Sequence, residues 1–107
     1  MSKVVHVTEN NFEAEVINSA IPVLADFWAP WCGPCQMLGP VMEQLAAELD
    51  GKVKVAKINT DEASNLARRY DIMTIPTVMV FSGGEILETA VGAKPKGEFL
   101  RMLNEIL

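Results

Sequence analysis

Cysteine, basic residues and long apolar runs are all scarce in this sequence. There are two cysteines in 107 residues, too few for a secreted scaffold held together by several disulfides. The first residues contain no apolar stretch of the kind that forms a signal peptide, and no run approaches the length of a membrane span. The chain has nine basic and fourteen acidic residues, and its net charge of -5 would repel a phosphate backbone. We therefore expect one cytoplasmic domain, residues 1–107, that binds neither nucleic acid nor membrane.

The first half of the chain alternates strands with helices. Residues 4–7 and the nearly continuous apolar run at 21–29 predict strands, the second one buried on both faces. A helix after Thr8, with Phe12 and Val16 on one face, is expected between them. A long helix follows from the cysteine motif to Asp50 and Gly51, and Pro40 should kink it.

The second half changes pattern. Residues 52–59 alternate like a strand, and 60–70 read as a short helix with acids at its start and arginines near its end. Residues 75–81 and 85–91 are strands joined by a tight turn, so these two run antiparallel. A last helix opens at Pro95. The order predicts an α/β fold with a central mixed five-stranded sheet flanked by four helices.

The two cysteines lie three residues apart, at the point where the long helix begins. Side chains at that spacing have Cβ atoms about 5–6 Å apart, close to the distance that a disulfide needs. A small adjustment of the first turn lets the bond form and break without unfolding the domain. Because so short a loop restricts the unfolded chain very little, stability is a poor reason for such a bond.

The helix N-terminus should favour a thiolate at Cys32, whose sulfur we expect to be exposed. The helix dipole is worth about 0.3–1 kcal/mol, which is less than one pKa unit, so hydrogen bonds to the sulfur must supply any further lowering. Gly33 and Pro34 add no charge between the cysteines. The reduced form of the pair is therefore not strongly stabilised, and the pair should act as a reductant.

Three other interpretations fit less well. A zinc site needs about four ligands, and apart from the two cysteines the chain offers one distant histidine, His6, and scattered carboxylates, so we expect no metal. A cysteine protease needs a histidine beside its thiolate, and His6 has no evident route there. Two inert core cysteines would lie on an apolar stripe rather than beside Trp, Gly and Pro.

Residues 31–35, WCGPC, resemble the active site of the thioredoxin family. The similarity extends along the whole chain, because DFWAPWCGPC, KVAKIN, IPTVMVF, GGE and VGA occur in the family's order. The resemblance implies the thioredoxin fold and a protein-disulfide reductase in which Cys32 is the nucleophile and Cys35 resolves the mixed disulfide. It also implies no bound cofactor, a monomer, disulfide-containing target proteins, and electrons from NADPH through a flavoprotein thioredoxin reductase.

Asp26 is an acid inside an apolar strand, where a carboxylate is costly. It either reaches water at a strand end or is desolvated, with a raised pKa that allows it to accept a proton from Cys35. The resemblance implies the second role, with Lys57 as a modulating charge, although a lysine at the end of a strand is by itself more often simply solvated.

The resemblance also implies a cis peptide bond before Pro76 and a docking surface for targets. The residues of this surface are Trp31, Gly33, Pro34, Thr74, Ile75, Pro76, Gly92 and Ala93. Backbone groups of Ile75 would pair with an extended target segment. In the alternative view, Trp31 is ordinary packing and Gly92 a turn or bulge. Gln36, Gly39 and Met73, together with Thr74, depart from the most familiar bacterial pattern and leave the preference for partners open.

Two alternative functions remain to be separated from reduction. A redox-gated binding module would dock partners in one oxidation state without turnover. An oxidase or isomerase would need an oxidising compartment, which Gly33, Pro34 and the missing export signal argue against.

Overall fold

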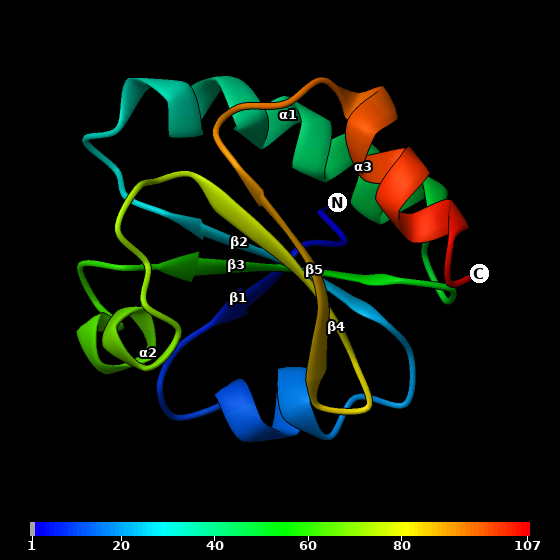
Figure 1. Ribbon diagram of the computed structural model, residues 1–107, viewed down its shortest axis with the longest axis horizontal. Helices are drawn as coiled ribbons and strands as arrows, with labels where there is room; N and C mark the ends of the chain where they lie inside the picture. Colours follow the sequence, from blue (N-terminus) through cyan, green and yellow to red (C-terminus); the bar gives the residue numbers. More distant parts are fainter. Residues whose placement is uncertain (1) are drawn as a thin grey trace.

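The computed structural model describes residues 2–107, which form a five-stranded sheet between two layers of helices (Figure 1). The elements, in chain order, are β1 (Val5–Val7), η1 (Glu13–Ile17), β2 (Val23–Trp28), α1 (Gly33–Glu48), β3 (Lys54–Asn59), α2 (Ser64–Arg69), β4 (Thr77–Ser82), β5 (Glu85–Val91) and α3 (Lys96–Asn104). The predicted α/β fold is confirmed, with four helices flanking one mixed sheet.

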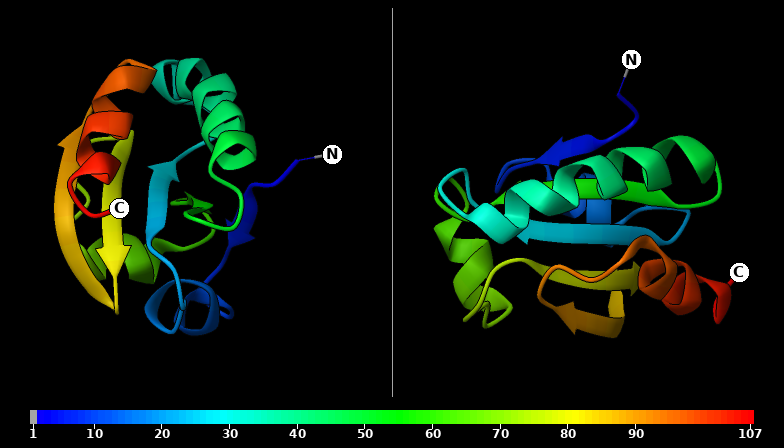
Figure 2. Two further views of the ribbon diagram at one scale, coloured as in Figure 1. Left: turned by 90° about the vertical axis from the view of Figure 1, so that its right-hand side faces the viewer. Right: turned by 90° about the horizontal axis from the view of Figure 1, so that it is seen from above.

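The strand order β1-β3-β2-β4-β5 places β2 at the centre of the sheet. It pairs in parallel with β3 and antiparallel with β4, while β5 forms a hairpin with β4. Helices α1 and α3 cover one face, and η1 and α2 cover the other (Figure 2). Strand β2 is therefore buried on both sides, as its continuous apolar sequence predicts.

Side chains on β2 alternate between the two layers. Leu24 belongs to the core beneath α1 and α3, whereas Ala25 and Phe27 belong to the core beneath η1 and α2. Asp26 and Trp28 lie on the α1 face because they share the parity of Leu24. This alternation puts one acidic residue under the helix that carries the cysteines.

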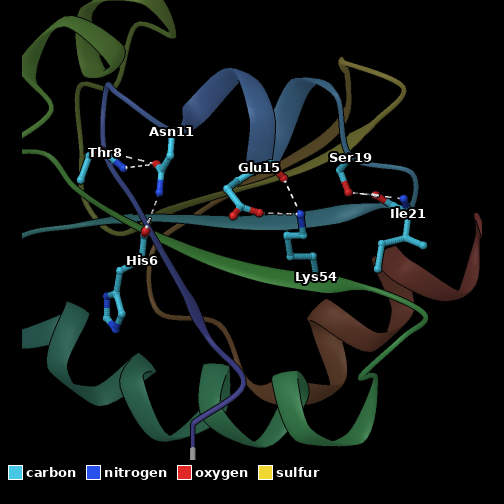
Figure 3. A network of polar contacts seen from close by, with 7 residues as sticks. All are labelled: His6, Thr8, Asn11, Glu15, Ser19, Ile21 and Lys54. Carbon is cyan, nitrogen blue, oxygen red and sulfur yellow. Dashed lines mark hydrogen bonds and ion pairs between the residues drawn. The ribbon is translucent and has the colours of Figure 1, made fainter.

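The first helix differs from the prediction. It is a short π-helix, Glu13–Ile17, and it does not begin at Thr8. The side-chain amide of Asn11 accepts a hydrogen bond from the Thr8 N–H (2.7 Å) and donates one to the His6 carbonyl (3.2 Å), which holds residues 8–11 in a turn (Figure 3). Lys54 Nζ donates to the Glu15 carbonyl and carboxylate, each at 2.9 Å, and so ties the helix to β3.

The boundaries of α1 and α3 are close to those predicted, whereas the start of α2 is not. Cys32 is the N-cap of α1, and Gly51, with φ 85°, follows the end of that helix. Pro95 is the N-cap of α3 rather than its first residue. Helix α2 begins later than the sequence suggests, because Asp61 and Glu62 lie in a turn in which the Asn59 carbonyl accepts from Glu62 and Ala63.

Candidate active site

Cys32 and Cys35 form a disulfide at the N-terminus of α1, with their Cα atoms 5.2 Å apart. Cys32 is in extended backbone conformation, and Cys35 lies in the first turn of the helix. The N–H of Cys35 points at the Cys32 sulfur, 3.2 Å away. This N–H belongs to the helix end, which normally leaves such donors without a partner. A thiolate at Cys32 in the reduced protein would accept a charge-assisted hydrogen bond here.

Both cysteines are buried, with 5% of Cys32 and 2% of Cys35 exposed. The expectation of an exposed Cys32 sulfur is therefore wrong for the oxidised protein. Ala29 packs with the two cysteines, and Trp28 and Ile75 lie against the same cluster. Cys32 nevertheless lies at the surface end of the pair, because its neighbours Trp31, Gly33 and Pro34 are all exposed.

The segment before β4 faces the disulfide. Its Ile75–Pro76 peptide bond is cis, the isomer that the family resemblance implies, and the Ile75 carbonyl oxygen lies 3.8 Å from the Cys32 sulfur. The Pro76 carbonyl accepts a hydrogen bond from the Gly92 N–H at 2.8 Å, which brings the loop after β5 to the same place. Gly92 has φ 99°, a conformation that favours glycine.

The sequence-predicted docking residues surround this segment with a largely accessible surface. Gly33, Pro34, Thr74 and Ala93 are exposed, while Ile75 and Gly92 are partly buried. Pro76 is buried. Trp31 is 72% exposed, which is too much for ordinary packing, and its Nε1 donates to the Asp61 carboxylate at 3.1 and 3.2 Å. Asp61 was not predicted, because it lies thirty positions away in the chain and no local pattern marks it.

Met73 and Gln36, two of the residues that depart from the familiar bacterial pattern, are both exposed. Met73 is 85% exposed, and Met37 beside Gln36 is exposed to a similar degree. The Gln36 side chain donates to the Pro30 carbonyl at 3.0 Å, which fixes it across the loop that precedes the cysteines.

Asp26 is fully buried, and neither of its carboxylate oxygens has a hydrogen-bond partner within residues 2–107. This burial raises the pKa of Asp26 to about 7, while the positive charge of Lys57 lowers it. Lys57 lies directly opposite Asp26 in the register of β2 and β3. The alternative interpretation, in which Asp26 reaches water at a strand end, is therefore wrong. The carboxyl is enclosed between the central strand and the helix layer that covers it.

Trp28 is a further residue of the site that was not predicted from the sequence. Its Nε1 is buried and has no hydrogen-bond partner in the described part of the chain. The Lys57 Nζ lies 4.2 Å from the centroid of its ring. The signal that could have found it is the strand period, because Trp28 lies two residues after Asp26 and on the same face.

No metal-binding cluster of three or more suitable side chains is found among residues 2–107, and no helix in that range is long and apolar enough to cross a membrane. Two sulfurs and one helix-end N–H meet at the disulfide, and a carboxyl whose pKa is raised by burial to about 7 lies on the face of β2 that α1 covers. This combination suits thiol–disulfide exchange, which needs a thiolate and a proton acceptor.

Comparisons with known proteins agree with this chemistry. The thioredoxin family model matches residues 3–105. The chain is 48% identical to thioredoxin 1 of Nostoc sp. over 107 residues, covering 100% of both proteins. It is 44% identical to the thioredoxin of Haemophilus influenzae, covering 98% of each. It is also 46% identical to the chloroplastic M-type thioredoxin of Chlamydomonas reinhardtii, covering 94% of this chain and 72% of that protein. The chain belongs to the thioredoxin family of thiol–disulfide oxidoreductases.

Proposed function

We propose that this protein reduces disulfides in other proteins by cycling between the Cys32–Cys35 dithiol and the disulfide. The observation that carries the proposal is the position of the bond at a helix N-terminus, with the Cys35 N–H directed at the Cys32 sulfur at 3.2 Å. Such a donor stabilises a thiolate on Cys32 and supplies nothing comparable to Cys35. The two sulfurs therefore have different roles.

In the first step, the Cys32 thiolate attacks one sulfur of the target disulfide, and the other target sulfur leaves as a thiolate. The product is a mixed disulfide between Cys32 and the target. Cys35 then loses its proton and attacks the Cys32 sulfur, which expels the second target thiolate. The target has gained two electrons and the pair has lost two, so the protein ends in the oxidised form.

We assign the proton acceptor for Cys35 to Asp26, with Lys57 as the charge that tunes it. A general base is most effective when its pKa is near the working pH, and burial raises the pKa of Asp26 to about 7. Replacing Asp26 with Asn should slow the second step and remove a rise in rate around pH 7. If neither the rate nor its pH profile changed, Asp26 would not be the acceptor.

The proposed docking surface consists of Trp31, Gly33, Pro34, Thr74, Ile75, Pro76, Gly92 and Ala93. Its centre is the Ile75 backbone, whose carbonyl lies 3.8 Å from the Cys32 sulfur. An extended target segment that pairs with this backbone places its own disulfide beside Cys32. Trp31 then supplies apolar area next to the reacting sulfurs.

We further propose that the whole chain, residues 1–107, is one thioredoxin domain that works as a monomer in the cytoplasm and binds no cofactor itself. A flavoprotein thioredoxin reductase would return it to the dithiol form with electrons from NADPH. A chloroplast location is the competing possibility, since one relative is named as chloroplastic. Fractionation of the source cells with an antibody against the chain would separate the two.

The proposal is tested by insulin reduction, measured with dithiothreitol and separately with NADPH and a thioredoxin reductase. We expect turnover in both assays, and the absence of turnover with either donor contradicts the proposal. Cys35→Ser should accumulate covalent complexes with target proteins, because the mixed disulfide cannot be resolved. Cys32→Ser should not, and equal trapping by the two variants would contradict the assignment of the nucleophile.

The alternative function, a binding module that docks partners without turnover, is distinguished from a reductase by the variant in which both cysteines are replaced with serine. A reductase loses its biological role in this form, whereas a binding module keeps it.

A further inference from the structure

Lys57 is the positive charge that faces Asp26, yet the two side chains do not hydrogen-bond. Both Asp26 oxygens lack a partner within residues 2–107, although the residues are direct neighbours in the register of β2 and β3. Adjacent strands lie about 4.8 Å apart, and Lys57 has four side-chain carbons with which to direct its ammonium elsewhere. The distance between the two charges is therefore set by whatever holds the ammonium.

The group that holds it is the Trp28 ring. The Lys57 Nζ lies 4.2 Å from the ring centroid, well inside the range of a cation–π contact. Trp28 and Asp26 are two residues apart on β2 and point to the same face of the sheet, so the ring lies beside the carboxyl along the strand. Lys57 is only partly exposed, in agreement with an ammonium that lies against this ring.

The other charged groups around Lys57 do not replace this contact. On β1 the residue opposite Lys57 is His6, which is exposed, and its ring lies on the α1 side of the sheet (Figure 3). Helix α1 contributes two charged residues, Glu43 and Glu48, which contact Ser2 and Lys96 respectively. On β4 the residue opposite Asp26 is the apolar Val78.

We propose that Trp28 is a positioning residue, whose ring holds the Lys57 ammonium beside Asp26 and so fixes the charge that this carboxyl experiences. The role rests on the proposed function only in its consequence for the rate, because the electrostatic coupling exists whether or not Asp26 accepts a proton. Without the ring, the lysine would extend toward solvent, where its attraction for the carboxylate is screened.

The sign of the change in the Asp26 pKa, when the Trp28 ring is removed, separates a positioning role from a simple packing role. Losing a positioned positive charge raises the pKa of Asp26 further, because the carboxylate form loses its stabilising neighbour. Loosening the packing around a buried carboxyl admits water and has the opposite effect, since burial is what raises that pKa. A packing role and a positioning role therefore predict shifts of opposite sign.

The experiment is a titration of the Asp26 side-chain carboxyl by carbon-13 NMR in the oxidised protein. Lys57→Met should raise the Asp26 pKa by about one unit. Trp28→Leu should raise it by at least about half of that, and in the Lys57→Met background it should give no further rise. Trp28→Phe retains a smaller ring and should give a rise that is smaller than that of Lys57→Met, so it carries the test if the leucine variant does not fold.

A pKa that is unchanged or lowered in the Trp28 variants, or an equal rise in the Lys57→Met background, would overturn the proposal. The rate of insulin reduction gives a separate readout. If Asp26 is the acceptor, the pH at half-maximal rate moves with the titrated pKa. If the NMR shift appears and the rate profile does not move, the positioning role holds and the assignment of the proton acceptor fails.

Discussion

Replacing Asp26 with Asn should stabilise the folded protein, and the size of the effect should depend on pH. Burial raises the pKa of Asp26 from 3.8 to about 7. Between these values the carboxyl is protonated in the folded chain but ionised in the unfolded chain, so the unfolded chain binds fewer protons and stability falls as pH rises. One pKa unit corresponds to 1.36 kcal/mol, so the loss reaches about 4 kcal/mol above pH 7 and vanishes below about pH 4.

The amide of Asn has the shape of a protonated carboxyl and does not ionise. The variant should therefore be more stable than the wild type by about 4 kcal/mol at pH 8, apart from a pH-independent offset for the buried amide. The measurement is urea unfolding of the oxidised proteins at intervals from pH 4 to pH 9. The matched control is Asp50→Asn, which removes an exposed acid paired with Lys3 and should change stability by less than about 1 kcal/mol. Parallel stability curves for the Asp26→Asn variant and the wild type would refute the reasoning, because they would mean that Asp26 titrates equally in both states.

Three substitutions test the fold itself by urea unfolding. Phe27→Ala removes a fully buried ring from β2 and should lower the free energy of unfolding by about 3–5 kcal/mol, and a loss below 1 kcal/mol would contradict its place in the core. Gly92→Ala should cost about 1–2 kcal/mol, because φ 99° suits glycine even though the space for a Cβ is open. Gly39→Ala is its control: it lies inside α1 with equally open space and should stabilise by about 0.5–1 kcal/mol.

The sheet and its helices could be predicted because the spacing of apolar residues typical of strands and that typical of helices are both clear in this sequence. A continuous run at residues 21–29 marked the central strand, and a two-glycine turn marked the hairpin of β4 and β5. The start of η1 could not be predicted, because it depends on a hydrogen bond from Asn11 to the His6 carbonyl and on Lys54, which is far away in the chain. Local propensity contains no information about such partners.

In the active site, too, local features could be predicted from the sequence and distant contacts could not. Cys32 at the N-cap and Asp26 within the strand are local features, and their placement was predicted. The burial of Cys32 was not predicted, because it depends in part on Ile75, which packs against the cysteines from the distant segment before β4. Asp61 and Trp28 were missed for a related reason. Their roles are defined by one bond across thirty residues and by one lysine on the neighbouring strand.

The burial of Asp26 connects stability and rate through a single quantity, the free energy needed to ionise the carboxyl in the folded protein. Relative to the wild type, Lys57→Met and Trp28→Leu should change that free energy without removing the carboxyl. If Asp26 is the proton acceptor, each unit of increase in its pKa must move the pH midpoint of the reaction upward by one unit. The same change must deepen the loss of stability between pH 4 and pH 9 by about 1.4 kcal/mol. A packing defect that leaves the Asp26 pKa unchanged adds the same amount at every pH and drops out of this comparison. A series in which the stability term follows the titration while the rate midpoint stays fixed would show that the pH dependence of the rate does not come from Asp26.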